Sequence, residues 1–349
     1  MTIEEVKIRR LANQYLISKG ETHTVIRELC GFQAQFMTNA LHAMKLRCSD
    51  FSPESAASGL VKNWTIRGTV HVFSEEDLPL FIHCQNGKNH RLDTWYGYYF
   101  EKTKIYILTP ERQKYFSHVI LDALQNGPLT RERLKEICRE NGMTKNEESA
   151  MFDTWGGGIG ELCQRGFINY VVEEKKSYCL SPPFVPIPEG EANLEIARRY
   201  FTHFAPATIK DAMYYFRATK AQVTDWLTAL PVKSMECGGK SYYYIENGRT
   251  YREHIPECLF LAGFDQLMLG YEKKESLFLP PEHLRGIFNL AGIVMPAILL
   301  HGRVVGKWKK SGGQLRLTLF ESIEERERRS VRNAAEQLWD DLCQIQWEE

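Results

Sequence analysis

Residues 116–142, FSHVILDALQNGPLTRERLKEICRENG, contain two helical stretches joined by the turn Gly127-Pro128-Leu129-Thr130. A further helix is predicted around residues 159–165, and an apolar hairpin follows at residues 166–182. Helix, turn, helix, helix and hairpin is the order of elements in a winged helix. This part of the chain therefore predicts a winged-helix domain.

The same order of elements returns at residues 193–246. There the turn Ala205-Pro206-Ala207-Thr208 corresponds to the Gly-Pro-Leu-Thr turn of the first stretch, and a Gly-Gly turn separates the strands VKSME and KSYYYIE. Recurrence of one structural unit along a chain indicates internal duplication. We therefore expect two consecutive winged helices.

The segments on either side of these repeats have other patterns. Residues 3–20 predict an amphipathic helix, and two or three more helices precede a short strand near residues 70–73. From about residue 251, short alternating segments such as CLFLAGFDQLMLGY and GGQLRLTLFES predict the strands of a small β domain. The tail at residues 323–347 predicts a charged helix that packs on the body. Its packing side chains are Ile323, Val331, Leu338, Leu342 and Ile345.

Composition indicates an ordinary folded protein with no overall preference for nucleic acid. The chain has 349 residues, of which 43% are hydrophobic and 25% charged, which excludes disorder as the main state and favours several domains. Lys plus Arg and Asp plus Glu are both 44, so the formal net charge is zero. Residues 321–349 hold nine acids and four arginines, so this tail can compete with phosphate for the mildly basic body.

Several classes of protein are excluded by motifs that the sequence lacks. No apolar run approaches the roughly 18 residues of a membrane span, and the charged N-terminus is no signal peptide, so we expect a cytoplasmic protein. The nine cysteines form no CxxC pair, which argues against a disulfide framework and a zinc site. Neither HExxH nor GxSxG occurs, and we expect no metal and no cofactor.

The most basic stretch of the chain contains no acid between Glu282 and Glu321. A ribbon with cations and an aromatic residue can follow a phosphate backbone or enter a groove. The alternative is a solvated hairpin whose lysines protect an edge strand. The residues alone leave both interpretations open, and the winged-helix repeats favour nucleic acid. The residues in question are Arg303, Lys307, Trp308, Lys309 and Lys310.

Six motifs, taken in order, resemble the AlkZ/YcaQ family of winged-helix DNA glycosylases: LCGFQAQ, WTIRGTVHVFSEED, GPLTRERL, FAPATIKDAMYYF, LFLAGFDQLMLGY and GRVVGKWKK. The similarity extends over about residues 5–320. The family's three tandem winged helices and β domain imply that the N-terminal helices and strand form another winged helix. The expected class is α+β, with tandem winged-helix domains followed by a small C-terminal β domain and a terminal helix.

This resemblance implies four domains. They are residues 1–110 (winged helix 1, with the Gln-x-Gln motif), 111–190 (winged helix 2), 191–250 (winged helix 3) and 251–349 (β domain with the basic hairpin and C-terminal helix).

The resemblance also implies the catalytic residues. A Gln-x-Gln or Gln-x-Asp motif is catalytic in the family, so similarity points to Gln33 and Gln35 and to the AlkZ-like Gln-x-Gln branch. By spacing alone these amides would be surface or capping residues. The implied reaction is hydrolysis of the N-glycosidic bond of cationic N-alkylated purines by a water that amides position. N7-alkylguanines, including bulky or crosslinked adducts, are the expected substrates, and no lyase step is expected.

Other DNA-binding residues follow from the same similarity. Arg67, Thr69 and His71 match the family's RGTLH-like segment, which places them near the pocket or on the DNA backbone. A buried, structural His71 is the alternative. The hairpin at residues 303–310 is then expected to contact phosphates or the minor groove.

Competing functions stay open on the residues. One is a non-catalytic winged-helix DNA-binding protein, such as a transcription regulator, in which Gln33 and Gln35 contact DNA or cap a helix. Another is a protein-interaction module, which the neutral charge would suit. The leading hypothesis is a monomeric glycosylase whose partner is double-stranded DNA with alkylated bases, without a membrane.

Overall fold

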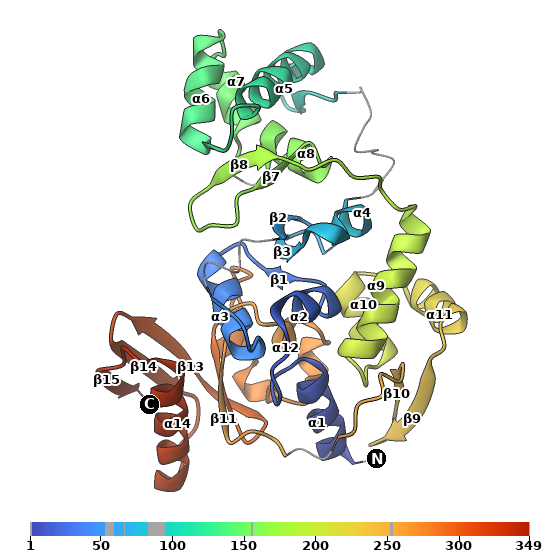
Figure 1. Ribbon diagram of the computed structural model, residues 1–349, viewed down its shortest axis with the longest axis vertical. Helices are drawn as coiled ribbons and strands as arrows, with labels where there is room; N and C mark the ends of the chain where they lie inside the picture. Colours follow the sequence, from blue (N-terminus) through green and yellow to red (C-terminus); the bar gives the residue numbers. More distant parts are fainter. Residues whose placement is uncertain are drawn as a thin grey trace. The chain divides into compact units, whose positions relative to one another are not determined.

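The computed structural model describes residues 2–52, 59–65, 67–82, 95–154, 156–251 and 254–348. The chain forms two compact units: unit 1 comprises Met1–Ala56 and Leu194–Glu349, and unit 2 comprises Ala57–Asn193. Both units combine helices with small sheets, which confirms the α+β class (Figure 1). The tandem winged helices and the domain boundaries at 110, 190 and 250 stay predictions.

Unit 2 contains the first repeat, and its elements follow the predicted order except for one additional helix at Lys145–Met151. A threonine begins each of two helices here: Thr109 accepts a hydrogen bond from the amide of Arg112, and Thr130, in the Gly-Pro-Leu-Thr turn, accepts one from Arg133. Such caps satisfy amides that have no partner inside the helix. The elements are α5 (Pro110–Leu124), β6 (Leu129–Thr130), α6 (Arg131–Glu140), α7 (Lys145–Met151), α8 (Gly157–Gln164), β7 (Ile168–Tyr170) and β8 (Ser177–Leu180).

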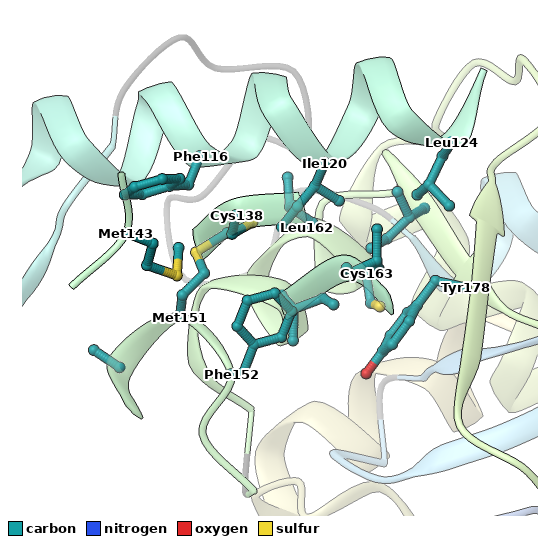
Figure 2. Close-up of a cluster of buried hydrophobic side chains, with 14 of the residues drawn as sticks. Phe116, Ile120, Leu124, Cys138, Met143, Met151, Phe152, Leu162, Cys163 and Tyr178 are labelled. Atoms are coloured by element: carbon teal, nitrogen blue, oxygen red, sulfur yellow. The ribbon is translucent and has the colours of Figure 1, made fainter. Parts of the chain in front are cut away.

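One apolar core holds this repeat together. Phe116, Ile120 and Leu124 recur on one side of α5 and point at side chains from α6, α8 and β8 (Figure 2). Their spacing of four residues places them on a single helical face. The predicted helices therefore pack as their periodicity requires.

Two further hairpins belong to unit 2. The first joins β2 (Leu60–Trp64) to β3 (Val70–Ser74), and the strands of this sheet follow the order β3-β2-β7-β8-β6. The second, β4 (Tyr98–Phe100) with β5 (Ile105–Leu108), is a separate two-stranded sheet. The short helix α4 (Leu78–Phe81) follows β3.

Unit 1 begins with three helices and the shortest strand. The elements are α1 (Ile3–Asn13), α2 (Thr22–Glu28), β1 (Phe32–Gln33) and α3 (Met37–Arg47). The predicted helix over residues 3–20 is too long, because α1 ends at Asn13. Tyr15 adopts a left-handed backbone with φ of 60°, which a right-handed helix cannot include.

The second repeat also lies mostly in unit 1. Its turn threonine, Thr208, forms a reciprocal capping box with Asp211 at the start of α10. Arg10 of α1 reaches the same turn: it donates to the carbonyl of Pro206 at 2.7 Å and pairs with Asp211 at 2.9 Å. The elements are α9 (Glu189–His203), α10 (Ile209–Phe216), α11 (Lys220–Ala229), β9 (Lys233–Cys237) and β10 (Lys240–Tyr244).

The C-terminal part of unit 1 is a five-stranded sheet in the order β11-β12-β13-β14-β15, with α14 packed beside β11 (Figure 1). Residues 258–271 are only partly the predicted strand, because Asp265 caps a short helix, α12. The elements are β11 (Cys258–Leu261), α12 (Gln266–Leu269), α13 (Leu284–Ile287), β12 (Ala297–Leu300), β13 (Arg303–Ser311), β14 (Gln314–Leu319), α14 (Glu325–Leu338) and β15 (Gln344–Glu348).

The tail is the largest difference from the predicted secondary structure. The expected helix over residues 323–347 ends at Leu338, and the chain returns as β15, parallel to β14. Ile345 and Trp347 of β15 pack on the core of this sheet, so burial of these side chains favours the strand over a longer helix. The predicted packing of Ile323, Val331, Leu338 and Leu342 is confirmed.

None of the helices in the described parts of the chain is long and apolar enough to cross a bilayer.

Candidate active site

Gln33 and Gln35 lie between α2 and α3 in unit 1. Gln33 ends strand β1 and is 8% exposed, whereas Gln35 is exposed and lies two residues before Met37, the first residue of α3. No described residue is recorded as a hydrogen-bond partner of either side-chain amide. Both amides are therefore able to bind water or a ligand, and neither caps a helix in the described part of the chain.

The backbone before the motif makes a sharp turn. Cys30 and Gly31 have left-handed φ values of 57° and 79°, and the amide of Gly31 donates to the carbonyl of Ile26 at 2.8 Å. This hydrogen bond closes the end of α2 and sends the chain directly into β1. The carbonyl of Gly31 in turn accepts a hydrogen bond from the side chain of Gln266. A segment far away in the sequence, which contains Gln266, thus fixes the turn that leads into the Gln-x-Gln motif.

Each of residues 263–266, which we call the GFDQ segment, contacts a residue close to the Gln-x-Gln motif in the chain. Asp265 and Arg47 form a doubly hydrogen-bonded pair, with oxygen–nitrogen distances of 2.7 and 3.0 Å, and both side chains are fully buried. Arg47 is the last residue of α3, so this pair fixes the helix that follows the motif. A planar guanidinium facing a carboxylate in this way restricts both position and orientation.

The first half of the GFDQ segment packs on the start of α3. A Cβ atom at Gly263 would lie 2.9 Å from Nδ2 of Asn39, so a larger residue there would displace the Asn39 side chain. The ring of Phe264 stacks on that of Phe36, with centroids 6.0 Å apart, and Phe36 remains 42% exposed next to Gln35. An exposed aromatic ring therefore directly follows Gln35 in the chain.

The sequence assigned no role to Asp265 and Gln266. The only available signal was their presence in LFLAGFDQLMLGY, one of the motifs that carries the family resemblance. Their function depends on contacts with residues more than 200 positions earlier, which residue spacing cannot reveal.

Arg67, Thr69 and His71 lie in unit 2, at the turn between β2 and β3 and in β3 itself. Arg67 and Thr69 are partly exposed, whereas the His71 side chain is completely buried. Nδ1 of His71 is 3.0 Å from the carbonyl of Thr69, so this nitrogen donates and the other, Nε2, has no partner among the described residues. The placement fits the alternative of a structural histidine that shapes the turn.

The basic hairpin is partly neutralised by acids of the same unit. Arg303 pairs with Glu282 at 3.1 Å and with Glu321 at 2.9 Å, and Lys310 pairs with Asp341 at 2.6 Å. Hydrogen bonds from Arg303 and Lys310 lower the pKa of the Glu321 and Asp341 carboxyl groups, respectively. The tail thus competes for the basic face, as its composition suggested.

Two cations of the hairpin keep no acidic partner. Lys307, half-buried, and Lys309, exposed, alternate along β13 and so share one face of the strand. Neither has an ion-pair partner among the described residues. These two ammonium groups are therefore available to an anion.

Trp308 points to the opposite face of β13 and packs inside unit 1. Its indole nitrogen donates to the carbonyl of Leu261 at 2.9 Å, and its ring lies 4.8 Å from that of His42 and 5.2 Å from that of Trp339. Trp308 is half-buried in this cluster, so only its exposed part could reach DNA, and the predicted contact stays a prediction. Its observed contacts instead join β13 to α3, the helix that follows the Gln-x-Gln motif.

Among the described residues there is no cluster of three or more histidine, cysteine or acidic side chains able to hold a metal ion.

Comparison with known proteins identifies the family. The model of the AlkZ-like DNA glycosylase family matches residues 26–340. A curated protein of Streptomyces sahachiroi, an interstrand DNA cross-link repair glycosylase, is 25% identical over 341 residues, which cover 90% of each chain. The solved structure of the Streptomyces sahachiroi DNA glycosylase AlkZ is similar with a TM-score of 0.76 and 21% identity, covers 99% of both chains and supports the same fold. With the predicted resemblance thus confirmed, the chain belongs to the AlkZ-like family of DNA glycosylases, enzymes that hydrolyse N-glycosyl bonds.

Proposed function

We propose that this glycosylase removes cationic N-alkylated purines, above all N7-alkylguanines, and that Gln33 and Gln35 position the attacking water. The observation that carries the proposal is the pair of side-chain amides without a described partner, held by a turn and a helix that the GFDQ segment fixes. The motif CGFQAQFM contains no lysine that could form a Schiff base, so an abasic site is the expected product.

The chemistry suits uncharged side chains. A guanine alkylated at N7 already carries a positive charge and leaves easily, so strong protonation by an acid is unnecessary. What remains is to hold a water beneath C1′ and to stabilise the positive charge that develops on the sugar. Amide oxygens accept hydrogen bonds from water and present a negative dipole to that charge, and fixed dipoles of this kind need no reorganisation during the reaction.

Bulky or crosslinked adducts are included in the proposed substrate class. Support comes from the name of the Streptomyces sahachiroi relative, an interstrand DNA cross-link repair glycosylase. We further propose that the protein acts in the cytoplasm as a monomer on double-stranded DNA and without a cofactor.

DNA binding is proposed for two sets of residues. Lys307 and Lys309 are the strongest candidates for phosphate contacts, because no described acid neutralises them. Arg67 and Thr69 at the β2–β3 turn are partly exposed and can contact the backbone, with His71 shaping that turn. Arg303 and Lys310 would have to exchange their carboxylate partners for phosphate.

Base release tests the catalytic assignment. The substrate is a duplex with a single N7-methylguanine, abasic sites are scored by alkaline cleavage, and spontaneous loss is subtracted. Gln33→Ala and Gln35→Ala are each expected to slow release by roughly 10²–10³-fold, the effect of removing one group that stabilises transition-state charge. DNA affinity should be retained, and Gln337→Ala, at an exposed position on α14, is the matched control. Wild-type rates in both motif variants would refute the assignment.

The pH profile separates an amide from a base. Amides do not titrate, so the wild-type rate is expected to be constant between about pH 5 and 8. Gln35→Asp introduces a group with an ordinary pKa of about 3.9 and should make the rate fall as that carboxylate is protonated. A wild-type rate that rises through a single titration in this range would point to another residue as the base.

A further inference from the structure

Exposed apolar side chains are concentrated in one short part of unit 2. Of the eleven large hydrophobic residues exposed in the described chain, seven lie between residues 96 and 115. Clustered apolar exposure on a folded protein marks an interaction surface more often than chance. The seven are Tyr96, Tyr99, Phe100, Ile105, Tyr106, Ile107 and Tyr115.

The β4–β5 hairpin presents most of these side chains. Its base is anchored, because Leu108 is 1% exposed and lies in the core of unit 2 with Tyr98 packed against that core. Beyond this anchor, Tyr99 lies directly opposite Tyr106, and their ring centroids are 5.1 Å apart. Both rings are nearly half exposed, at 46% and 45%. The hairpin therefore holds two aromatic rings in place on a fixed support.

The neighbouring pair on the hairpin, Phe100 and Ile105, is also exposed. Successive residues of a strand point to opposite faces, so the apolar side chains occupy both faces of this hairpin. An ordinary surface hairpin buries one face and hydrates the other. Two exposed apolar faces indicate that the hairpin binds a partner on at least one of them.

A groove of about 580 Å³ runs along β5 and the start of α7. Its apolar side is lined by Phe100, Ile105, Tyr106 and Ile107, and its polar side includes the hydroxyl, amide and carboxylate groups of Thr144, Asn146 and Glu147. A planar, polar-edged group such as a nucleobase matches these two sides, because it needs apolar contact for its faces and hydrogen bonds at its edge.

The turn of the hairpin adds positive charge. Lys102 and Lys104 are exposed there and have no ion-pair partner among the described residues. One acid, Glu101, is in the same turn, so the net charge of residues 101–104 is positive. Aromatic rings next to lysines are the combination that single-stranded nucleic acid requires, since rings stack with bases and ammonium groups bind phosphates.

A second copy of the chain is the other occupant to consider. Stable protein interfaces use about 20–30 residues from each partner, whereas this surface offers about seven. DNA is already the substrate of the family, and the lysines complement its charge. The observations therefore favour nucleic acid.

We propose that the β4–β5 hairpin is a second DNA-binding element, which stacks unpaired bases against Tyr99 and Tyr106 while Lys102 and Lys104 bind the flanking phosphates. Enzymes that act on a base within a duplex benefit from holding the bases that are displaced. The proposal rests on the chain being a DNA glycosylase, and not on the roles of Gln33 and Gln35.

Binding of undamaged DNA tests the proposal independently of catalysis. The full chain is titrated into a fluorescein-labelled single strand of about 12 nucleotides and into the matching duplex, and anisotropy gives both Kd values. Tyr99→Ala with Tyr106→Ala is expected to raise the Kd for the single strand about tenfold or more, because stacking on an aromatic ring contributes strongly for each base. The Kd for the duplex should change less than about threefold, since its bases are already stacked.

Three further variants complete the test: one keeps both rings, one removes both lysines and one is a control for folding. Tyr99→Phe with Tyr106→Phe keeps both rings and should bind the single strand as the wild type does. Lys102→Ala with Lys104→Ala should lower the slope of log K against log salt by about 0.7 for each lysine. Val185→Ala, at a position that is 83% exposed in the same unit, is the matched control for loss of an apolar side chain.

Equal single-strand affinities for wild type and the double alanine variant would overturn the proposal. So would a wild-type dimer in sedimentation that becomes monomeric in this variant with unchanged DNA affinity, which would make the hairpin a contact between copies. Loss of base release in Gln33→Ala leaves these binding results unaffected, so the two proposals fail separately.

Discussion

His71 illustrates how burial sets the chemistry of a single residue. Its side chain is completely buried, and burial together with the nearby charge of Arg67 lowers its pKa to about 3. His203 in unit 1 is also buried, and its pKa is likewise lowered to about 3 by burial and by neighbouring arginines. Both rings are therefore neutral near pH 7: Nδ1 of His71 donates to the carbonyl of Thr69, and Nδ1 of His203 lies 3.0 Å from a carboxylate oxygen of Glu28.

This burial predicts a loss of stability in acid. Between about pH 6.5 and 3 the unfolded chain binds a proton at each of these histidines that the folded chain does not, so the free energy of unfolding falls as the pH falls. The slope is about 1.4 kcal/mol per pH unit for each histidine. Urea unfolding at pH 7 and pH 5 should show a smaller loss for His71→Asn than for wild type.

His118→Asn, at an exposed position on α5, is the control for the His71 variant and should leave the pH dependence unchanged. An identical loss in wild type and His71→Asn would show that His71 is protonated or hydrated in the folded protein.

At the scale of elements, the short GFDQ segment explains how the Gln-x-Gln motif is held. β1 has only two residues and α3 has no side-chain cap at its first turn, so neither element positions the glutamines by its own strength. Instead, Asp265 fixes the end of α3 and Gln266 fixes the turn that leads into β1. Contacts from the β domain thus define the geometry between α2 and α3.

Substitutions that break these contacts are expected to lower the free energy of unfolding. Asp265→Asn leaves the buried Arg47 charge without its ionic partner and should lower the free energy of unfolding by about 3–5 kcal/mol. Gln266→Ala removes a neutral hydrogen bond and should cost about 1 kcal/mol, so this variant stays folded. Slower base release by Gln266→Ala with unchanged DNA affinity, measured on the N7-methylguanine duplex, would assign it a positioning role. Asp225→Asn, exposed on α11, is the control.

At the scale of the whole molecule, charge is arranged locally although the chain is neutral overall. Acids of the tail pair with cations of the sheet: Asp341 with Lys310, and Glu348 with Arg316 at 3.3 Å. These exposed pairs add little stability but cancel charge that DNA would otherwise bind. Among the described residues of the hairpin strand β13, Lys307 and Lys309 are consequently the cations without an acidic partner.

The salt dependence of duplex binding measures this arrangement. Lys307→Ala and Lys309→Ala should each reduce the slope of log K against log salt by about 1, because each lysine displaces counterions from a phosphate. Arg303→Ala should reduce it less, since Glu282 and Glu321 already neutralise this guanidinium. Equal effects of all three substitutions would mean that Arg303 exchanges its partners on binding, and no effect of either lysine would remove the hairpin from the interface.

The sequence by itself determined the elements whose signals are local. Thr130 and Thr208 begin helices at the two repeated turns, and the Gly-Gly turn at residues 238–239 joins the two strands predicted for it. Caps, turns and periodicity act over a few residues, so they can be recognised in one segment without knowledge of the rest. The Gln-x-Gln motif could be proposed as a site only from the resemblance to the glycosylase family, because the spacing of the two glutamines does not indicate catalysis.

Only the tertiary structure decided the features that depend on distant partners. Whether residues 344–348 form a strand depends on the free edge of β14, and whether Arg303 is available to DNA depends on Glu282 and Glu321. The burial of His71 and the ion pair between Asp265 and Arg47 likewise arise from packing between segments far apart in the chain. Such contacts leave no pattern in the neighbouring residues, because their energy comes from desolvation and pairing that exist only after the chain has folded.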